Sequence, residues 1–247
     1  MYLYGLIGRR LGHSLSAGIF NARFLERQIN ARYELFELSD ISSLPDLIDT
    51  HPDLKGFNVT VPYKESIIPF IDCMTPEARM AGAVNCITVS RHPDGTHILT
   101  GHNTDIAGFN RLIAPFSPSG TDKALILGSG GAAKAVSISL SNFGSDVLIV
   151  SRHPSPLQMA YTDINGEILG RIQFIINATP LGMWPDTTET PPLPYHLLSP
   201  DHICLDLVYN PSTTEFMRRC ADRGATVRNG LAMLHGQADE NARIWGV

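Results

Sequence analysis

Lys123-Ala-Leu-Ile-Leu-Gly-Ser-Gly-Gly-Ala-Ala-Lys-Ala135 is the stretch on which the fold of this chain depends. Four apolar residues run into a glycine turn, and a small-residue pattern typical of a helix follows. From Gly128 the spacing is G-x-G-x-x-A, with Gly130 and Ala133 at the second and third positions. This pattern predicts a strand, a tight turn and a helix N-terminus that suits a pyrophosphate. A plain strand–turn–helix connection without a ligand gives a similar pattern.

A second strand-like segment, Asp146-Val-Leu-Ile-Val150, lies about 20 residues further on, where a dinucleotide site places its ribose-recognising residue. A site for NAD would carry an acidic residue there. The chain carries Ser151 and Arg152 instead, and a planar guanidinium suits a 2′-phosphate. We therefore expect NADP(H) as the cofactor, with a solvated surface arginine as the alternative interpretation of Arg152.

The composition limits the classes of function. The chain has 247 residues, enough for one large domain or two small ones. Its net charge is −5 without a basic block, which argues against nucleic acid and membrane surfaces as partners. The first residues lack a signal-peptide pattern, and no apolar run approaches the ~20 residues that span a bilayer, so we expect a cytoplasmic protein. Four scattered cysteines and nine dispersed histidines predict reduced thiols and no metal site.

The order of apolar segments predicts an α/β fold with two units. In the first unit we expect strands at 2–8, 31–38, 54–61, 86–90 and 97–100, and helices at 17–28, 43–50 and 104–113. This alternation predicts a small mixed sheet with right-handed crossovers, in which Pro93-Asp-Gly95 turns a hairpin. A linker at 115–120 leads into the second unit. There we expect strands at 124–127, 146–150, 174–177, 202–207 and 225–228, an irregular segment at 151–170, and helices at 213–223 and 231–245.

Several polar residues follow the predicted strands, where open α/β sheets place their ligands. Ser14 and Ser16 are two apart before a helix and can face one anion, and for the pair this interpretation and a purely structural one are equally good. Ser16 alone is better explained as an N-cap. Thr60 and Lys64 belong to Asn58-Val-Thr-Val-Pro-Tyr-Lys64, in which Pro62 breaks the strand. Spacing alone favours a solvated surface lysine at Lys64.

Three more candidates lie further along the chain. Asn85 opens a predicted strand, and Asp105 lies at the start of a predicted helix. An acid in the first turn of a helix is commonly explained by the helix dipole, whereas a functional interpretation pairs Asp105 with Lys64 as acid/base and orienting partner. Gln237 is a polar exception on the C-terminal helix and has little weight by itself.

Together these pieces resemble one family, the shikimate dehydrogenases. Eight motifs occur in the family's order, nearly end to end: Gly8-Arg-Arg-Leu-Gly-His-Ser-Leu-Ser16, Asn58-Val-Thr-Val-Pro-Tyr-Lys64, Gly82-Ala-Val-Asn85, Gly101-His-Asn-Thr-Asp105, Gly128-Ser-Gly-Gly-Ala132, Asn177-Ala-Thr179, Asp206-Leu-Val-Tyr-Asn-Pro211 and Gly230-Leu-Ala-Met-Leu-His-Gly-Gln237. Each motif alone is modest, but the ordered set favours functional roles for Lys64, Asp105 and Gln237.

The resemblance implies a two-domain enzyme that reversibly reduces 3-dehydroshikimate to shikimate with NADPH. It implies a substrate-binding domain at 1–103 plus 231–247 and a Rossmann NADP-binding domain at 104–230, as a monomer or homodimer. Lys64 and Asp105 would lie at the reacting carbonyl. The substrate would be held by Ser14, Ser16, Thr60, Asn85, Tyr209 and Gln237. The cofactor would be held by Gly128, Ser129, Gly130, Gly131, Ala132, Ser151, Arg152, Asn177, Thr179 and Gly230.

The chain departs from the family pattern in places. Ala17 and Phe20-Asn21 replace the usual Pro and His-Asn after the serines. Ser151-Arg-His-Pro154 replaces Asn-Arg-Thr, and the second basic residue that usually follows is missing. The C-terminal helix is less apolar than in the family, with polar or small residues at Gly236, Asp239 and Glu240.

Two alternatives therefore stay open. One is a quinate/shikimate dehydrogenase that uses NAD, against which the missing acid after Val150 argues. The other is a non-catalytic regulator that binds NADP or shikimate on the same scaffold, against which the presence of both Lys64 and Asp105 argues.

Overall fold

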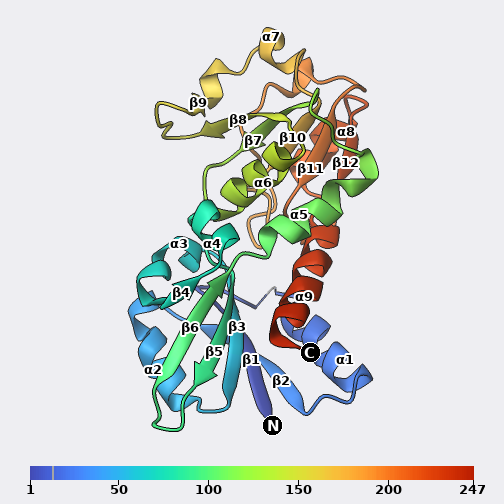
Figure 1. The fold of residues 1–247 in the computed structure, drawn as a ribbon. Coiled ribbons are helices and arrows are strands. Elements are labelled where there is room, and N and C mark those ends of the chain that lie inside the picture. Colours follow the sequence, from blue (N-terminus) through green and yellow to red (C-terminus); the bar gives the residue numbers. More distant parts are fainter. Residues whose placement is uncertain (13) are drawn as a thin grey trace. The chain divides into compact units, whose positions relative to one another are not determined.

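The computed structural model describes residues 1–12 and 14–247, which form two compact units (Figure 1). The first unit contains Met1–Thr104 and Gln237–Val247, and the second contains Asp105–Gly236. The chain leaves the first unit after Thr104 and returns to it at Gln237, inside the last helix. Both units combine helices with a six-stranded sheet, so the predicted α/β class is confirmed.

The first unit alternates strands and helices before it ends in a hairpin. Its strands are β1 (Tyr2–Gly8), β2 (Ala31–Glu37), β3 (Leu54–Val59), β4 (Cys73–Met74), β5 (Cys86–Arg91) and β6 (His97–His102). Its helices are α1 (Ser16–Glu26), α2 (Leu44–Thr50), α3 (Tyr63–Ser66), α4 (Pro76–Ala81) and the C-terminal part of α9 (Leu231–Trp245), with 3-10 turns at Ile41–Ser43 and Ile68–Phe70.

The sheet of the first unit has the order β2-β1-β3-β5-β6-β4. β1 pairs in parallel with β2 and β3, whereas β5 is antiparallel to both β3 and β6. This is the mixed sheet that the sequence predicts. The predicted hairpin is confirmed as well: Arg91 lies opposite His97, and Gly95 adopts a φ of +89° in the turn. The positive φ explains why glycine occupies that position.

β1 is buried on both faces, as expected of a central strand between helical layers. Leu3 and Ile7 belong to one core cluster together with Leu44 of α2. Tyr4 belongs to a second cluster with Phe20 of α1. Because successive side chains of a strand point to opposite faces, the two clusters lie on the two sides of the sheet.

The C-terminal end of α9 docks on the first unit through Trp245. Its Nε1 donates a 3.0 Å hydrogen bond to the Ile87 carbonyl, and its ring centroid lies 4.9 Å from that of Tyr4. A Cβ on Gly56 would lie 2.4 Å from the same Nε1. Glycine is therefore needed in β3 so that the indole can approach the sheet.

The second unit follows a regular strand–helix alternation. Its strands are β7 (Lys123–Leu127), β8 (Asp146–Ser151), β9 (Met159–Ala160), β10 (Phe174–Asn177), β11 (Ile203–Asp206) and β12 (Thr226–Arg228). Its helices are α5 (Asp105–Ile113), α6 (Gly131–Asn142), α7 (Gly166–Leu169), α8 (Glu215–Ala221) and the start of α9, with 3-10 turns at Ala114–Phe116, Tyr161–Asp163 and Tyr195–Leu197.

All strands of the second sheet run in parallel, in the order β12-β11-β10-β7-β8-β9. From β7 the chain moves outward to β9, crosses back to β10 and continues outward to β12. The strand order therefore reverses between β7 and β10, which is the doubly wound Rossmann arrangement. Ligands of such sheets bind beyond the carboxyl ends of the strands at this reversal.

Helices cover both faces of the second sheet. Phe109 of α5 and Val136 of α6 pack in one cluster, and Leu169 of α7 and Phe216 of α8 pack in the other. α5 and α9 approach closely, since a Cβ on Gly236 would lie 2.9 Å from the Cα of Gly108. The glycine at position 236, a departure from the family pattern, thus stands where two helices nearly touch.

The structure differs from the sequence-based prediction in short elements. The sequence pattern predicts no helix or strand in the segment that contains α3, β4 and α4. It predicts an irregular segment where β9 and α7 occur. β3 also ends at Val59, two residues earlier than predicted, because the Thr60 carbonyl already accepts the Tyr63 N–H of a turn at 2.9 Å. Elements of two to six residues are too short for a periodic apolar pattern to reveal.

Candidate functional site

The glycine turn after β7 has the geometry of a dinucleotide-binding loop. Gly128 has a φ of +108°, and a Cβ there would lie 3.0 Å from Thr179 Cγ2, so only glycine fits. A Cβ on Gly130 would meet no protein atom within 4 Å, which leaves the backbone open to a ligand. α6 begins directly after, at Gly131, and presents the N–H groups of its first turn. These residues fit a pyrophosphate group.

The end of β8 is tied to this loop by two hydroxyl groups. The Oγ atoms of Ser151 and Ser129 lie 3.2 Å apart in a hydrogen bond, and Ser151 Oγ also accepts the His153 N–H at 3.3 Å. Arg152 is exposed, and its positive charge opposes the rise that burial causes in the pKa of Tyr161. A guanidinium therefore stands at the tip of β8, where an NAD site would carry a carboxylate.

Asn177 ends β10 and is fully buried. Its Oδ1 accepts the Thr179 N–H at 3.0 Å and the Thr179 hydroxyl at 2.6 Å. Its Nδ2 donates to Asp206 Oδ1 at 3.0 Å and to the Leu181 carbonyl at 3.4 Å. These four bonds account for both hydrogens and both lone pairs of the amide. The side chain thus shapes the turn that contains Thr179.

Asp206 ends the neighbouring strand, β11, and is also fully buried. Its Oδ1 accepts from Asn177 Nδ2 and from the Val208 N–H at 3.0 Å, and its Oδ2 accepts from Thr214 Oγ1 at 2.5 Å. Burial raises its pKa from 3.8 to about 7, and the three hydrogen bonds only partly oppose this rise. Asp206 opens the motif Asp206-Leu-Val-Tyr-Asn-Pro211, and the motif alone predicts no role for it. The signal in the sequence that could have pointed to Asp206 is an acidic residue directly after three apolar strand residues.

Gly230 lies where two backbone segments nearly touch. A Cβ at this position would lie 2.1 Å from the Leu207 carbonyl oxygen, and the Gly230 N–H donates to the Val208 carbonyl at 3.0 Å. The glycine therefore holds the start of α9 against the segment that follows β11. Tyr209 belongs to the same segment and is half-buried.

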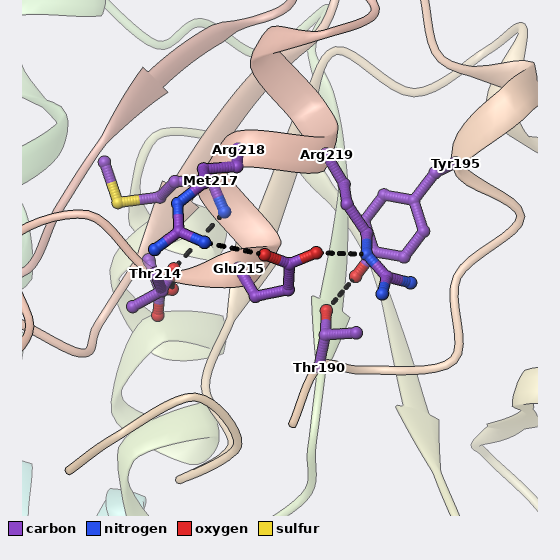
Figure 2. Close-up of polar contacts among 8 residues, drawn as sticks. Thr190, Tyr195, Thr214, Glu215, Met217, Arg218 and Arg219 are labelled. Atoms are coloured by element: carbon purple, nitrogen blue, oxygen red, sulfur yellow. Dashed lines mark hydrogen bonds and ion pairs between the residues drawn. The ribbon is translucent and has the colours of Figure 1, made fainter. Parts of the chain in front are cut away.

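α8 begins beside this network and has its own polar contacts at the surface. Thr214 caps the helix by accepting the Met217 N–H at 3.2 Å. Figure 2 shows Glu215 between Arg218 and Arg219, with ion-pair distances of 3.0 and 2.9 Å. The hydrogen bond from Arg219 is the largest cause of the lowered pKa of Glu215. Such exposed ion pairs add little stability to the helix. The contact that links α8 to Asp206 is the hydrogen bond from the Thr214 hydroxyl.

In the first unit, the polar candidates gather at one edge of the sheet. β1 and β3 are parallel and end at this edge, while β5 is antiparallel and begins there. Thr60 follows β3, its methyl group lying 2.7 Å from where a Cβ on Gly8 would stand. Lys64 lies in α3, half-buried, and its carbonyl accepts the Val84 N–H at 2.8 Å.

The serine pair precedes α1. Ser14 Oγ accepts the Ser16 N–H at 3.2 Å, and the Ser14 N–H donates to the Leu11 carbonyl at 2.8 Å. Leu15 occupies the N-cap position without a side-chain hydrogen bond, so Ser16 is the first residue of the helix and not its cap. Position 13, which belongs to the same motif, lies outside the described residues.

Asn85 is buried at the same edge in a chain of side-chain hydrogen bonds. Its Oδ1 accepts the Thr104 N–H at 2.7 Å and the Thr104 hydroxyl at 3.2 Å. The Thr104 hydroxyl shares its single hydrogen between Asn85 Oδ1 and Asn241 Oδ1 of α9, which lies 2.9 Å from Thr104 Oγ1. Gln237 lies one turn before Asn241 and is half-buried, and Asp105 follows Thr104 as the first residue of α5.

The structure thus gathers the predicted residues in two groups. The first unit holds Ser14, Ser16, Thr60, Lys64, Asn85 and Gln237, and the second holds Asp105, Tyr209 and the ten predicted cofactor residues. Among the described residues, no group of three or more His, Cys, Asp or Glu is arranged to hold a metal ion. In the same part of the chain, every helix is too short or too polar to cross a bilayer.

The chain is similar to known proteins over nearly its full length. A family model described as "Shikimate dehydrogenase substrate binding domain" matches residues 6–87. The protein named shikimate dehydrogenase (NADP(+)) from Pelodictyon phaeoclathratiforme is 36% identical over 263 residues, which cover 98% of this chain and 91% of that protein.

Solved structures show the same likeness. Shikimate dehydrogenase 1 from Peptoclostridium difficile is 35% identical, with a TM-score of 0.84 over 100% of this chain and 92% of that one. Shikimate 5-dehydrogenase from Thermus thermophilus, solved in complex with NADP(H) and shikimate, is 29% identical, with a TM-score of 0.86 over 100% of this chain and 94% of that one. The likeness therefore extends through both units.

Proposed function

The chain belongs to the shikimate dehydrogenase family, and we propose that it interconverts 3-dehydroshikimate and shikimate with NADP(H), in the biosynthesis of chorismate and the aromatic amino acids. One observation carries this proposal: the likeness to enzymes of this name runs through both units. The glycine loop of the second unit, which is open to a dinucleotide, agrees with it. The enzyme is then an oxidoreductase that acts on a CH–OH group.

The cofactor belongs at the carboxyl edge of the second sheet. Gly128, Ser129, Gly130, Gly131 and Ala132 would receive the pyrophosphate with backbone N–H groups at the start of α6. Ser151 and Arg152 would face the ribose phosphate, where the exposed guanidinium favours NADP over NAD. The turn that contains Asn177 and Thr179, with Gly230, would border the nicotinamide end. When bound, NADPH supplies a hydride to the substrate carbonyl carbon, and NADP⁺ accepts it in reverse.

The substrate would be held mainly by the first unit. The hydroxyls of Ser14 and Ser16, together with that of Tyr209, suit a carboxylate because they can all donate hydrogen bonds to it. Thr60, Asn85 and Gln237 suit the ring hydroxyls. We accordingly propose a substrate-binding domain at 1–103 plus 231–247 and an NADP-binding domain at 104–230.

Lys64 and Asp105 would act at the reacting carbonyl. During reduction an alkoxide develops on the carbonyl oxygen, and a protonated amine beside it stabilises the charge and delivers the proton. Lys64 has the group for both tasks. Asp105 would orient Lys64 and accept a hydrogen bond from a substrate hydroxyl.

We further propose a cytoplasmic monomer or homodimer without nucleic-acid or membrane partners. Cys204 and Cys220 are close enough for a hydrogen bond between their side chains, yet both are free thiols. Adjacent reduced cysteines fit a reducing compartment. The net charge of −5, without a basic block, gives no attraction to nucleic acids.

Initial rates test the function directly. Shikimate and quinate are each assayed as oxidation substrates against NADP and NAD. The proposal predicts that shikimate with NADP has the highest kcat/KM of the four pairs. A preference for quinate with NAD would instead support the alternative dehydrogenase, and NADP binding by calorimetry without turnover of either substrate would support the non-catalytic regulator.

A further inference from the structure

Asp206 is a buried carboxyl group that the chemistry above does not use. It ends β11 at the carboxyl edge of the second sheet, beside Asn177 at the end of β10. Three neutral groups donate to it: the Asn177 amide, the Val208 N–H and the Thr214 hydroxyl. Burial of a carboxyl group is unfavourable even with such partners. An apolar residue would fill the position without that cost, so the group calls for a reason.

The two oxygens of Asp206 serve different parts of the unit. Oδ1 accepts from Asn177, which ends β10, and from Val208, two residues after the end of β11. β10 flanks the strand-order reversal. Oδ2 accepts from Thr214, which caps α8. Removing the Thr214 contact should therefore affect the helix, whereas removing the Asn177 contact should affect the strand ends.

Asn177 transmits the Oδ1 contact to the glycine loop. Its own oxygen holds the N–H and the hydroxyl of Thr179, and the Ala178 N–H donates to the Leu127 carbonyl at 2.9 Å. The turn formed by these residues lies against Gly128, since a Cβ there would be 3.0 Å from Thr179 Cγ2 and 3.3 Å from the Ala178 carbonyl carbon. A rotation of the Asn177 amide would therefore displace the turn beside the loop.

We infer that Asp206 is a positioning residue for NADP(H): its Oδ1 fixes the Asn177 amide, which holds the Ala178–Thr179 turn beside the Gly128 loop that receives the cofactor. This inference rests on the proposed function only in naming NADP(H). Asn177 then affects cofactor binding only indirectly, by holding the shape of the turn. All four hydrogen bonds of its amide go to protein atoms, so none is left for the cofactor.

The test separates the two oxygens with four single variants. Asp206→Ala removes both contacts, and Asp206→Asn keeps an oxygen for Asn177 and Val208 while its amide faces the Thr214 hydroxyl. Of the Asp206 contacts, Thr214→Val removes only the hydrogen bond between Thr214 and Asp206 Oδ2. Asn177→Ala removes the hydrogen bond to Asp206 Oδ1 by deleting its donor. For each variant we would measure the melting temperature, the Kd for NADP by calorimetry without substrate, and KM and kcat with shikimate.

We expect Asp206→Ala and Asn177→Ala to raise both Kd and KM for NADP about tenfold, while KM for shikimate stays within about twofold. Asp206→Asn should keep the Kd within about twofold of the parent value. Thr214→Val should lower the melting temperature and leave the Kd unchanged. The double variant Asp206→Ala/Asn177→Ala should bind NADP no more weakly than Asn177→Ala, because the Asp206 contact acts on the turn through the Asn177 amide.

Two results would overturn the inference. One is an unchanged Kd in Asp206→Ala or, if that variant does not fold, in Asn177→Ala. The other is an equal rise of the Kd for NADP in Thr214→Val and Asp206→Ala, which would show a general loss of packing. If the parent enzyme binds NADP but does not oxidise shikimate, the proposed reaction fails, and the calorimetric series still decides the role of Asp206.

Discussion

Asn177 Nδ2 donates a 3.0 Å hydrogen bond to Asp206 Oδ1 across the carboxyl ends of two adjacent parallel strands. Both side chains are fully buried, and both lie at the edge of the sheet where a dinucleotide is expected. This pair connects the cap of α8 to the turn that borders the glycine loop. It also makes the stability of the second unit depend on pH.

The pH dependence follows from the pKa of Asp206, which burial raises from 3.8 to about 7. Between these values the native protein holds a proton that the unfolded chain has released. The contribution of this group to the free energy of unfolding is therefore complete below about pH 4 and is lost as pH rises to about 7, by at most ~1.4 kcal/mol per pH unit.

Asp206→Asn removes this titration, so its stability relative to the parent should rise between about pH 4 and 7 and stay level above that. Denaturation by urea at half-unit pH steps measures the effect. Thr190→Val serves as the control, because Thr190 hydrogen-bonds Tyr195 in the same unit without touching Asp206. Parallel pH profiles for the parent and Asp206→Asn would contradict the prediction.

Gly130→Ala should separate cofactor binding from folding. The position has a φ of −78°, and a Cβ would meet no protein atom within 4 Å, so we expect an unchanged melting temperature. The added methyl group would enter the space proposed for the pyrophosphate and raise the Kd for NADP by about tenfold or more.

Gly166→Ala is the matched control, because a Cβ there also meets no protein atom and the residue begins α7 away from the loop. It should leave both the melting temperature and the Kd unchanged. Equal NADP binding in the Gly130→Ala protein and the parent would place the pyrophosphate elsewhere.

Arg152→Ala should reduce the preference for NADP over NAD. Loss of the guanidinium removes a charge-assisted contact to the 2′-phosphate, so we expect KM for NADP to rise about ten- to a hundredfold while KM for NAD changes little. Steady-state kinetics with both cofactors measure the ratio. Arg171→Ala is the control, because Arg171 is also exposed and its ion pair is with Glu167 of α7. An equal rise of KM for NADP and for NAD in Arg152→Ala would refute this role.

Lys64→Ala should impair the chemical step. Loss of a general acid typically lowers turnover by about 10²–10⁴-fold, and we expect kcat to fall within that range while NADP affinity stays within about twofold. Lys55→Ala, in β3 of the same unit, should retain normal turnover, since the Lys55 ammonium lies 5.4 Å from the centroid of the Tyr2 ring and serves packing. Turnover near the parent value in Lys64→Ala would exclude it as the proton donor.

The strand–helix alternation was predictable because the buried strands of both sheets are nearly continuous apolar runs. β1 and β10 match the predicted segments residue for residue, and β7 begins one residue earlier than predicted. The short elements α3, β4, α4, β9 and α7 were not predicted, since tertiary contacts and not periodicity define them. The charges on α9 were also unexplained by the sequence, and the structure pairs Asp239 with Arg23 and Glu240 with Arg243.

The sequence by itself determined the family, the glycine fingerprint and the identity of the polar residues, because these depend on residue types in a fixed order. Only the tertiary structure decided what those residues contact. It assigned the Asn177 amide to the turn and to Asp206, tied Asn85 to Thr104, and showed that Gly130 faces open space while Gly128 and Gly230 are enclosed by backbone. The physical reason is that hydrogen bonds and close approaches between distant segments depend on how sheets and helices pack, which local sequence does not encode.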